Sequence, residues 1–101
     1  DKAVERARAR WPMRIIEVEC ETLAQVGQAC EAGVDVVMLD NMTPEEVGKA
    51  VALVSGRANT EVSGTITPDT VGSYAETGVD FISVGAITHS VRVLDIGLDV
   101  Q

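Results

Sequence analysis

The chain has 101 residues, of which 46% are hydrophobic and 24% are charged, a composition that fits one compact domain and excludes a disordered segment. No apolar run approaches the roughly 20 residues that span a bilayer, and the N-terminus lacks a signal-peptide hydrophobic region, so no membrane partner is expected. The net charge of −8 and the scarcity of aromatic residues argue against a nucleic-acid partner. Cys20 and Cys30 are too few for a disulfide framework, so a cytoplasmic location is expected.

The start of the chain alternates between helical and extended patterns. Residues 1–10 are good helix formers, and Trp11-Pro12 ends that helix because a residue before proline avoids the α region. Residues 15–19 are expected as a strand. Residues 21–32 carry apolar side chains at helical spacing, with Gly33 as a left-handed cap.

The middle of the chain continues the alternation. Residues 34–39 form a short apolar run that is typical of a strand covered on both faces. Thr43 is expected to cap the next helix, which starts at Pro44 with acids in its first turn and runs to about residue 56. Residues 59–63 are expected as the third strand.

The last part of the chain repeats these signals. The Thr67-Pro68-Asp69 segment is expected to open a helix that Gly78 closes, and residues 79–84 are expected as a buried fourth strand. We expect a short helix over residues 86–92. Residues 93–100 alternate irregularly and are interpreted as a further short helix or an edge segment.

An internal repeat of about 44 residues organises these elements. The pattern of residues 31–39 recurs at residues 76–84, and the pattern of residues 16–19 recurs at residues 60–63. Each copy is a βαβα unit, about residues 15–58 and 59–101, within the single unit 1–101. The pattern predicts an α/β fold with parallel βα units that form part of an open (β/α) barrel, like a TIM barrel, with a small doubly wound sheet as the alternative.

Acidic side chains stand at the ends of the first two predicted strands. Glu17 and Glu19 share one face of their strand, and Asp40 follows a wholly apolar run. The C-terminal ends of parallel strands form the reactive rim of such folds, where acids hold a hard divalent cation or hydrogen-bond sugar hydroxyls. The alternative for each acid is a solvated strand edge or a helix cap.

Glycine and hydroxyl residues stand at the ends of the last two predicted strands. Ser63, Gly64 and Thr65 follow one strand, and Gly85 and His89 follow the other. Glycine lets the backbone approach a ligand, and N–H groups at a helix start bind anions, so the pair of loops indicates a phosphate site. Each glycine alone is also typical of a turn, and His89 is also compatible with a surface position.

Four blocks of the chain resemble quinolinate phosphoribosyltransferase. They are IEVECETL (residues 16–23), EAGVDVVMLDNMTPEE (31–46), EVSGTIT (61–67) and ETGVDFISVGAITHSVRVLDIGLD (76–99). The resemblance implies the C-terminal part of the family's open barrel domain, with the N-terminal α/β sandwich domain absent. It also implies Mg²⁺-dependent synthesis of nicotinate mononucleotide, pyrophosphate and CO₂ from quinolinate and 5-phosphoribosyl 1-pyrophosphate in NAD biosynthesis.

The resemblance also implies roles for individual residues. Glu19 and Asp40 match the catalytic acids that contact the ribose hydroxyls and the Mg²⁺-bound pyrophosphate side, and Glu17 is a further candidate in that set. Matches to the positions that hold the 5-phosphate are Ser63, Gly64, Gly85 and His89. Thr65 departs from the family, which commonly has glycine or asparagine there, so a backbone contact that needs positive φ is strained at this position.

The charge distribution predicts that this chain is inactive alone. After Ile15 it has three basic residues against 14 acids, which is too little positive charge to gather two anionic substrates. The family's basic residues for quinolinate and pyrophosphate come before the stretch seen in this sequence. The alternative function is an inactive or engineered half-barrel scaffold that at most binds phosphate. Exposed edges of a parallel sheet predict a homodimer or higher homo-oligomer under either function.

Overall fold

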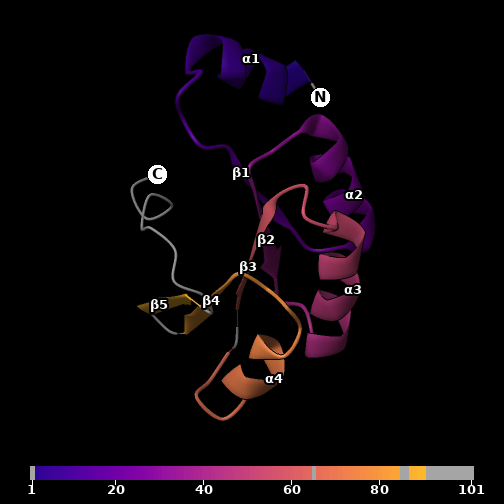
Figure 1. Ribbon diagram of the computed structural model, residues 1–101, viewed down its shortest axis with the longest axis vertical. Coiled ribbons are helices and arrows are strands. Elements are labelled where there is room, and N and C mark those ends of the chain that lie inside the picture. The colour runs from indigo at the N-terminus through magenta and orange to yellow at the C-terminus, as the bar shows by residue number, and fades with distance from the viewer. Residues whose placement is uncertain (1, 65, 85–86, 91–101) are drawn as a thin grey trace.

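In this computed structural model, one five-stranded sheet organises the residues that the structure describes, 2–64, 66–84 and 87–90 (Figure 1). The strand order is β1-β2-β3-β4-β5; the first four strands are parallel and β5 runs antiparallel to β4. The elements in chain order are α1 (Lys2–Arg10), β1 (Glu17–Cys20), α2 (Leu23–Ala32), β2 (Val36–Asp40), α3 (Pro44–Val54), β3 (Asn59–Ser63), α4 (Val71–Ala75), β4 (Phe81–Val84) and β5 (Ile87–Ser90).

The strand order identifies the barrel type of α/β fold. Each parallel strand lies beside the next one in the sequence, with no reversal of direction along the sheet. Figure 1 shows α2 and α3 side by side on the same side of the sheet. A doubly wound sheet covers both faces with helices and reverses its strand order at a switch point. The prediction of parallel βα units from part of an open barrel is therefore confirmed, and the alternative is excluded.

The hydrophobic core lies between the sheet and these two helices. Val37, Leu39, Val62 and Ile82 bring fully buried side chains to it from the three inner parallel strands. The helices contribute buried residues at helical spacing, which are Val26, Ala29, Cys30, Val47, Ala50 and Val54. Because strand side chains alternate between faces, the residues between these apolar positions point to the opposite face of the sheet.

Local capping signals define the start of α3. The Glu46 N–H donates to Thr43 Oγ1 over 3.2 Å, and the Thr43 N–H donates to Glu46 Oε1 over 2.9 Å, a reciprocal capping box ahead of Pro44. The hydrogen bond from the Thr43 backbone lowers the pKa of Glu46. Gly33 ends α2 with φ of 80°, as predicted. Among the described helices, none combines the length and apolarity needed to cross a bilayer.

Two expectations for the second half of the chain are wrong. The helix expected from residue 67 begins only at Val71, because the Thr67 N–H donates to Thr70 Oγ1 over 3.0 Å and residues 68–70 form a turn. The short helix expected over residues 86–92 is replaced at Ile87–Ser90 by β5, which pairs with the otherwise free edge of β4. Residues 93–100, expected as a helix or edge segment, lie outside the described residues.

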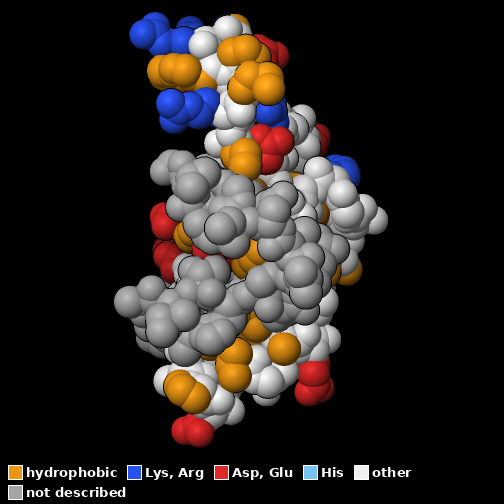
Figure 2. Space-filling view, turned by 60° about the vertical axis from the view of Figure 1, so that its left-hand side comes forward, with side chains coloured by type: hydrophobic (Ala, Val, Ile, Leu, Met, Phe, Trp, Pro, Cys, Tyr) orange, Lys and Arg blue, Asp and Glu red, His pale blue; other side chains and the backbone are white. Residues whose placement is uncertain are grey.

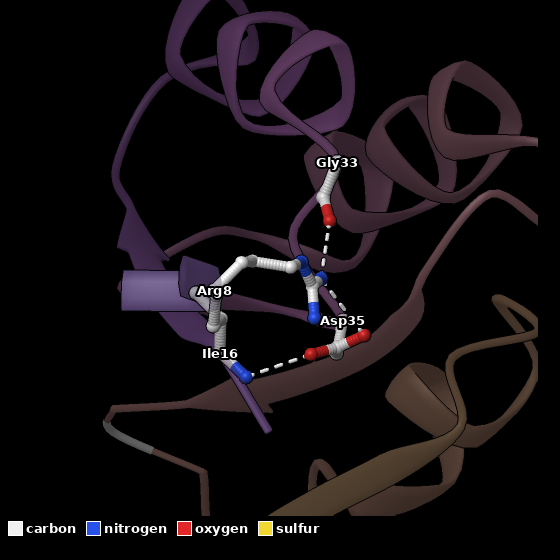
Figure 3. A network of polar contacts seen from close by, with 4 residues as sticks. All are labelled: Arg8, Ile16, Gly33 and Asp35. Carbon is white, nitrogen blue, oxygen red and sulfur yellow. Dashed lines mark hydrogen bonds and ion pairs between the residues drawn. The ribbon is translucent and has the colours of Figure 1, made fainter. Parts of the chain in front are cut away.

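Asp35 fixes the start of β2 against its neighbours. Its Oδ2 accepts the Ile16 N–H over 2.8 Å, and its Oδ1 accepts Arg8 Nη2 over 3.1 Å (Figure 3). The same guanidinium nitrogen donates to the Gly33 carbonyl over 2.6 Å. The carboxylate thus joins α1 to the segment before β1, and the guanidinium joins α1 to the Gly33 cap of α2.

Asp80 makes the equivalent connection in the second repeat. Its Oδ2 accepts the Thr60 N–H over 2.8 Å, and its own N–H donates to Thr60 Oγ1 over 3.1 Å. The sequence offsets of 44 and 45 relate Thr60 to Ile16 and Asp80 to Asp35. Both aspartates therefore stand at the N-terminal rim of the sheet, where their bonds stabilise the starts of the strands.

We expect Asp35→Ala to lower the free energy of unfolding by about 1–3 kcal/mol, because the Ile16 N–H loses its carboxylate acceptor. Arg8→Ala removes only the half-exposed ion pair and the bond to Gly33, and is expected to cost about 1 kcal/mol or less. Urea unfolding measures both, with Glu31→Ala on the exposed side of α2 as the matched acidic control. An Arg8→Ala variant less stable than Asp35→Ala contradicts the expectation.

Candidate functional site

Polar side chains gather on the face of the sheet opposite α2 and α3. Glu19 is in register with Met38, and Met38 is in register with Glu61, so these three residues share one row across the sheet. The next row contains Asp40 beside Ser63. Residues at matched register positions point to the same face of a parallel sheet. The register therefore places Glu19, Asp40 and Ser63, all predicted from the sequence, on one face.

A cavity of about 570 Å³ opens beside this face, between α1 and β1. Its lining combines the acids Glu17 and Glu19 with Met38, Arg14 and the half-exposed Trp11. This volume lies in the range of small-molecule sites. Figure 2 shows Lys and Arg side chains gathered mainly at the α1 end of the molecule, with Asp and Glu side chains reaching the surface further along it. The cavity lies where these two regions meet.

Glu17 is expected at the end of its strand, but it is the first residue of β1, because the strand begins two residues later than expected. Like charges on this face act on its carboxyl group. Burial is the main cause that raises the pKa of the half-buried Glu17 carboxyl, and the neighbouring charges of Glu61 and Glu19 raise it further. The three carboxyl groups are therefore close enough to interact. Such a face favours positive charge on a bound molecule and disfavours a bare anion.

The ends of β2 and β3 bring Asp40 and Ser63 together. Ser63 Oγ donates to Asp40 Oδ1 over 3.4 Å, a long bond that leaves the hydroxyl available to another acceptor. The Asn41 N–H donates to the Ser63 carbonyl over 3.2 Å, and Asn41 adopts a left-handed φ of 55°. The acid and the hydroxyl predicted at this rim therefore lie side by side.

A buried tyrosine holds the loop that follows Asp40. Tyr74, on α4, donates its hydroxyl to the Met42 carbonyl over 2.7 Å, and both residues are buried. The sequence does not predict this role, although Tyr74 is the chain's only tyrosine and a buried tyrosine hydroxyl usually needs a partner. The short α4 thereby reaches back to fix the loop beside the site.

Gly64 approaches Asn41 too closely for any side chain. A Cβ on Gly64 would lie 2.8 Å from Asn41 Oδ1 and 3.2 Å from the Asn41 backbone nitrogen. Its φ of 121° also lies in a region that residues with side chains rarely adopt. This glycine is therefore required for the packing of the β3 loop against the β2 loop.

Glu61 is a site residue that the sequence reasoning missed. Its Oε2 accepts the Ser83 hydroxyl over 3.0 Å, which joins β3 to β4 on the same face. The internal repeat carries the signal that would have found it, since the offset of 44 relates Glu61 to Glu17. Glu61 thus occupies in the second repeat the place that Glu17 has in the first.

The second predicted phosphate loop is only partly described. Thr65 and Gly85 lie outside the described residues. His89 belongs to β5, with its backbone opposite Ile82, so the helix start expected to present it is wrong for residues 87–90. Because α4 begins only at Val71, no helix N-terminus directly follows Gly64 either. Anion binding at the first loop would depend on Ser63 and on loop N–H groups.

The acids suit a metal that arrives with its ligand better than a resident metal. Within the described ranges, no three His, Cys, Asp or Glu side chains gather into a metal-binding group. Mg²⁺ is commonly held by one or two carboxylates together with substrate phosphates and water. Glu19 and Asp40 offer carboxylates of this kind.

Known proteins resemble this chain over nearly its whole length. A family model described as "Quinolinate phosphoribosyl transferase, C-terminal domain" matches residues 1–99. A probable nicotinate-nucleotide pyrophosphorylase (carboxylating) of Bacillus subtilis is 44% identical over 100 residues, covering 98% of this chain and 35% of that protein. The nicotinate-nucleotide pyrophosphorylase (carboxylating) of Rattus norvegicus is 40% identical over 103 residues, covering 97% and 34%.

Solved structures show the same likeness. The nicotinate-nucleotide pyrophosphorylase of Francisella tularensis matches with a TM-score of 0.80 and 44% identity, covering 88% of this chain and 32% of that one. The chain therefore spans about a third of the length of the relatives that it matches.

We expect Gly64→Ala to lower the free energy of unfolding by about 1–3 kcal/mol, because it adds backbone strain and crowds Asn41. Gly48→Ala, in the interior of α3 with open space around it, is the matched control and is expected to stabilise the protein by up to about 1 kcal/mol. Thermal unfolding compares the two. Equal effects of the two substitutions would contradict the proposed crowding.

We expect Glu17→Gln to stabilise the protein near neutral pH. A pKa raised by folding means that the folded state binds the Glu17 proton more tightly than the unfolded state, so ionised Glu17 costs stability above that pKa. The gain should shrink as acid protonates Glu17 in the parent protein. Unfolding midpoints against pH measure this, with Glu21→Gln on the exposed segment before α2 as control. A gain independent of pH would count against the charge effect.

Proposed function

The chain belongs to the quinolinate phosphoribosyl transferase family, and on that premise we propose that it forms part of an enzyme that makes nicotinate mononucleotide. The proposed reaction joins quinolinate to 5-phosphoribosyl 1-pyrophosphate and releases pyrophosphate and CO₂, a step of NAD biosynthesis. The observation that carries the proposal is the family match over residues 1–99, supported by relatives whose names state nicotinate-nucleotide pyrophosphorylase activity.

Glu19 and Asp40 are proposed to act on the sugar. In the proposed reaction the ring nitrogen of quinolinate forms a bond to ribose C1 as the bond from C1 to pyrophosphate breaks. Positive charge develops on the sugar during this exchange, and carboxylates fixed nearby favour it electrostatically. Both acids lie on the face that the parallel register creates, and both can also accept hydrogen bonds from ribose hydroxyls. Glu17 adds negative charge from the adjoining cavity.

Ser63 and Gly64 are proposed to bind the 5-phosphate of the sugar. The long bond from Ser63 to Asp40 leaves the Ser63 hydroxyl able to turn toward a phosphate oxygen. The absence of a Cβ at Gly64 permits close approach of a ligand as well as of Asn41. The proposed phosphate-binding set also includes Thr65, Gly85 and His89. For these three residues the proposal rests only on the resemblance of the sequence motifs to the family.

Mg²⁺ is proposed as the cofactor, and when bound it would neutralise charge on the departing pyrophosphate. Glu19 and Asp40 are the residues that would hold it, together with phosphate oxygens of the substrate. Their role is then to orient a metal–substrate complex rather than to form a closed metal site, which is consistent with the donor set among the described residues.

The described basic residues after Ile15, Lys49 and Arg57, make interactions that do not serve this reaction. Lys49 pairs with Glu45 over 3.6 Å on exposed α3, and Arg57 donates to the Leu53 and Val54 carbonyls at the end of that helix. With these basic groups engaged elsewhere, we propose that the 101-residue chain on its own behaves as a scaffold that at most binds phosphate, which is the second candidate function. A cytoplasmic location and a homo-oligomer assembled through the β1 edge are further proposals.

We expect the purified 101-residue chain, supplied with Mg²⁺ and both substrates, to make no nicotinate mononucleotide. To test the function itself, the chain replaces the matched segment of the Bacillus subtilis relative, and product formation is followed by chromatography. The chimera is expected to be active, and Asp40→Asn in it to lower kcat/KM by at least about 100-fold, because charge stabilisation at the sugar is lost.

The matched control in the chimera is Glu31→Gln, an exposed acid of α2. A chimera that folds but makes no product while the unmodified relative is active would contradict the proposed function. Turnover by the isolated chain would contradict its proposed inactivity.

A further inference from the structure

The ends of β3 and β4 at the rim that carries the site have different backbone partners among the described residues. The β2–β3 register continues to the pair Asp40 and Ser63. Within the described part of the chain, the β3–β4 register consists of Glu61 with Phe81 and Val62 with Ile82, and the end of β4 pairs with β5 through Ser83 and Val84. Backbone pairing therefore holds the Ser63 end of β3 to β2 and the Ser83 end of β4 to β5, so a side-chain contact between Glu61 and Ser83 links the two strand ends directly.

A side-chain hydrogen bond crosses between β3 and β4 at this point. Ser83 donates its hydroxyl to Glu61 Oε2 over 3.0 Å, and both residues are half-buried. A serine hydroxyl has one hydrogen, so Ser83 cannot donate to a phosphate while it makes this bond. A bond to an ionised carboxylate is stronger than a neutral one, which suits it to holding two strand ends together.

We propose that Glu61 is a positioning residue of the phosphate site: it accepts the Ser83 hydroxyl and thereby fixes the end of β4 against the Ser63–Gly64 end of β3. Glu61 acts through Ser83 and touches no substrate. This inference rests on the proposed binding of phosphate at Ser63 and Gly64. It adds a residue that the sequence motifs left unassigned, and it gives a reason for an acid two residues before Ser63 on the same face.

A purely electrostatic role and a positioning role of Glu61 predict opposite effects of its removal on phosphate binding. A carboxylate near a bound phosphate repels it, so a purely electrostatic role means that removal tightens binding. A positioning role means that removal weakens binding, since the strand ends lose their connection. Glutamine separates the two, because its amide oxygen still accepts the Ser83 hydrogen but carries no charge.

The experiment titrates inorganic phosphate into the ¹⁵N-labelled 101-residue chain and follows the Ser63 and Gly64 amides by NMR. Glu61→Ala and Ser83→Ala are each expected to raise the Kd about three- to tenfold, and the double variant no more than either single one. Glu61→Gln is expected to bind phosphate at least as tightly as the parent chain. Ser73→Ala, exposed on α4, is the matched control and should leave the Kd unchanged.

Each other outcome overturns the inference. Tighter binding by Glu61→Ala shows that Glu61 acts only through its charge, and weaker binding by Glu61→Gln shows that the accepted hydrogen bond is not what matters. Additive losses in the double variant show that the two residues act separately. If Glu61→Ala fails to fold, Ser83→Ala and Glu61→Gln carry the same test. A parent chain without saturable phosphate binding defeats the proposed phosphate site as well, whereas unchanged variants of a binding parent defeat the positioning role alone.

Discussion

The arrangement of the sheet depends on two carboxylates at its N-terminal rim. Asp35 and Asp80 each accept a backbone N–H from the preceding strand segment, Ile16 in one repeat and Thr60 in the other. A slip of one residue between parallel strands would turn every side chain to the opposite face, so these contacts decide which residues reach the site. With the register fixed, the apolar residues of β2 meet the helices, and Asp40 faces the site beside Ser63.

The site itself is built by contacts between successive loops rather than by any one motif. Gly64 packs against Asn41, Asn41 donates to the Ser63 carbonyl, and Tyr74 holds the Met42 carbonyl from the next helix. Each contact joins segments that are far apart in the sequence. The position of Asp40 therefore depends on two elements that follow it in the chain, the end of β3 and the short α4.

The sequence predicts most strongly where the causes are local. The cap at Thr43 and the left-handed Gly33 each involve neighbours within a few positions, and both are confirmed. One error arises where distant pairing decides, because Ile87–Ser90 forms a strand at the edge that β4 offers. The turn at residues 68–70 has a local cause, the bond from the Thr67 N–H to Thr70 Oγ1. Glu61 was missed because its importance lies in a contact with Ser83 on another strand, although the repeat relates it to Glu17.

Residues of the candidate site lower the stability of the folded protein. Burial and the charges of Glu61 and Glu19 raise the pKa of Glu17, so folding brings like charges together on one face. Gly64 holds a backbone conformation that only glycine tolerates well. Neither feature helps the core, which lies on the other face of the sheet between α2, α3 and the strands. The two features lie at different ends of the sheet, Glu17 at the start of β1 and Gly64 after the end of β3, and each lowers stability outside the packing between sheet and helices.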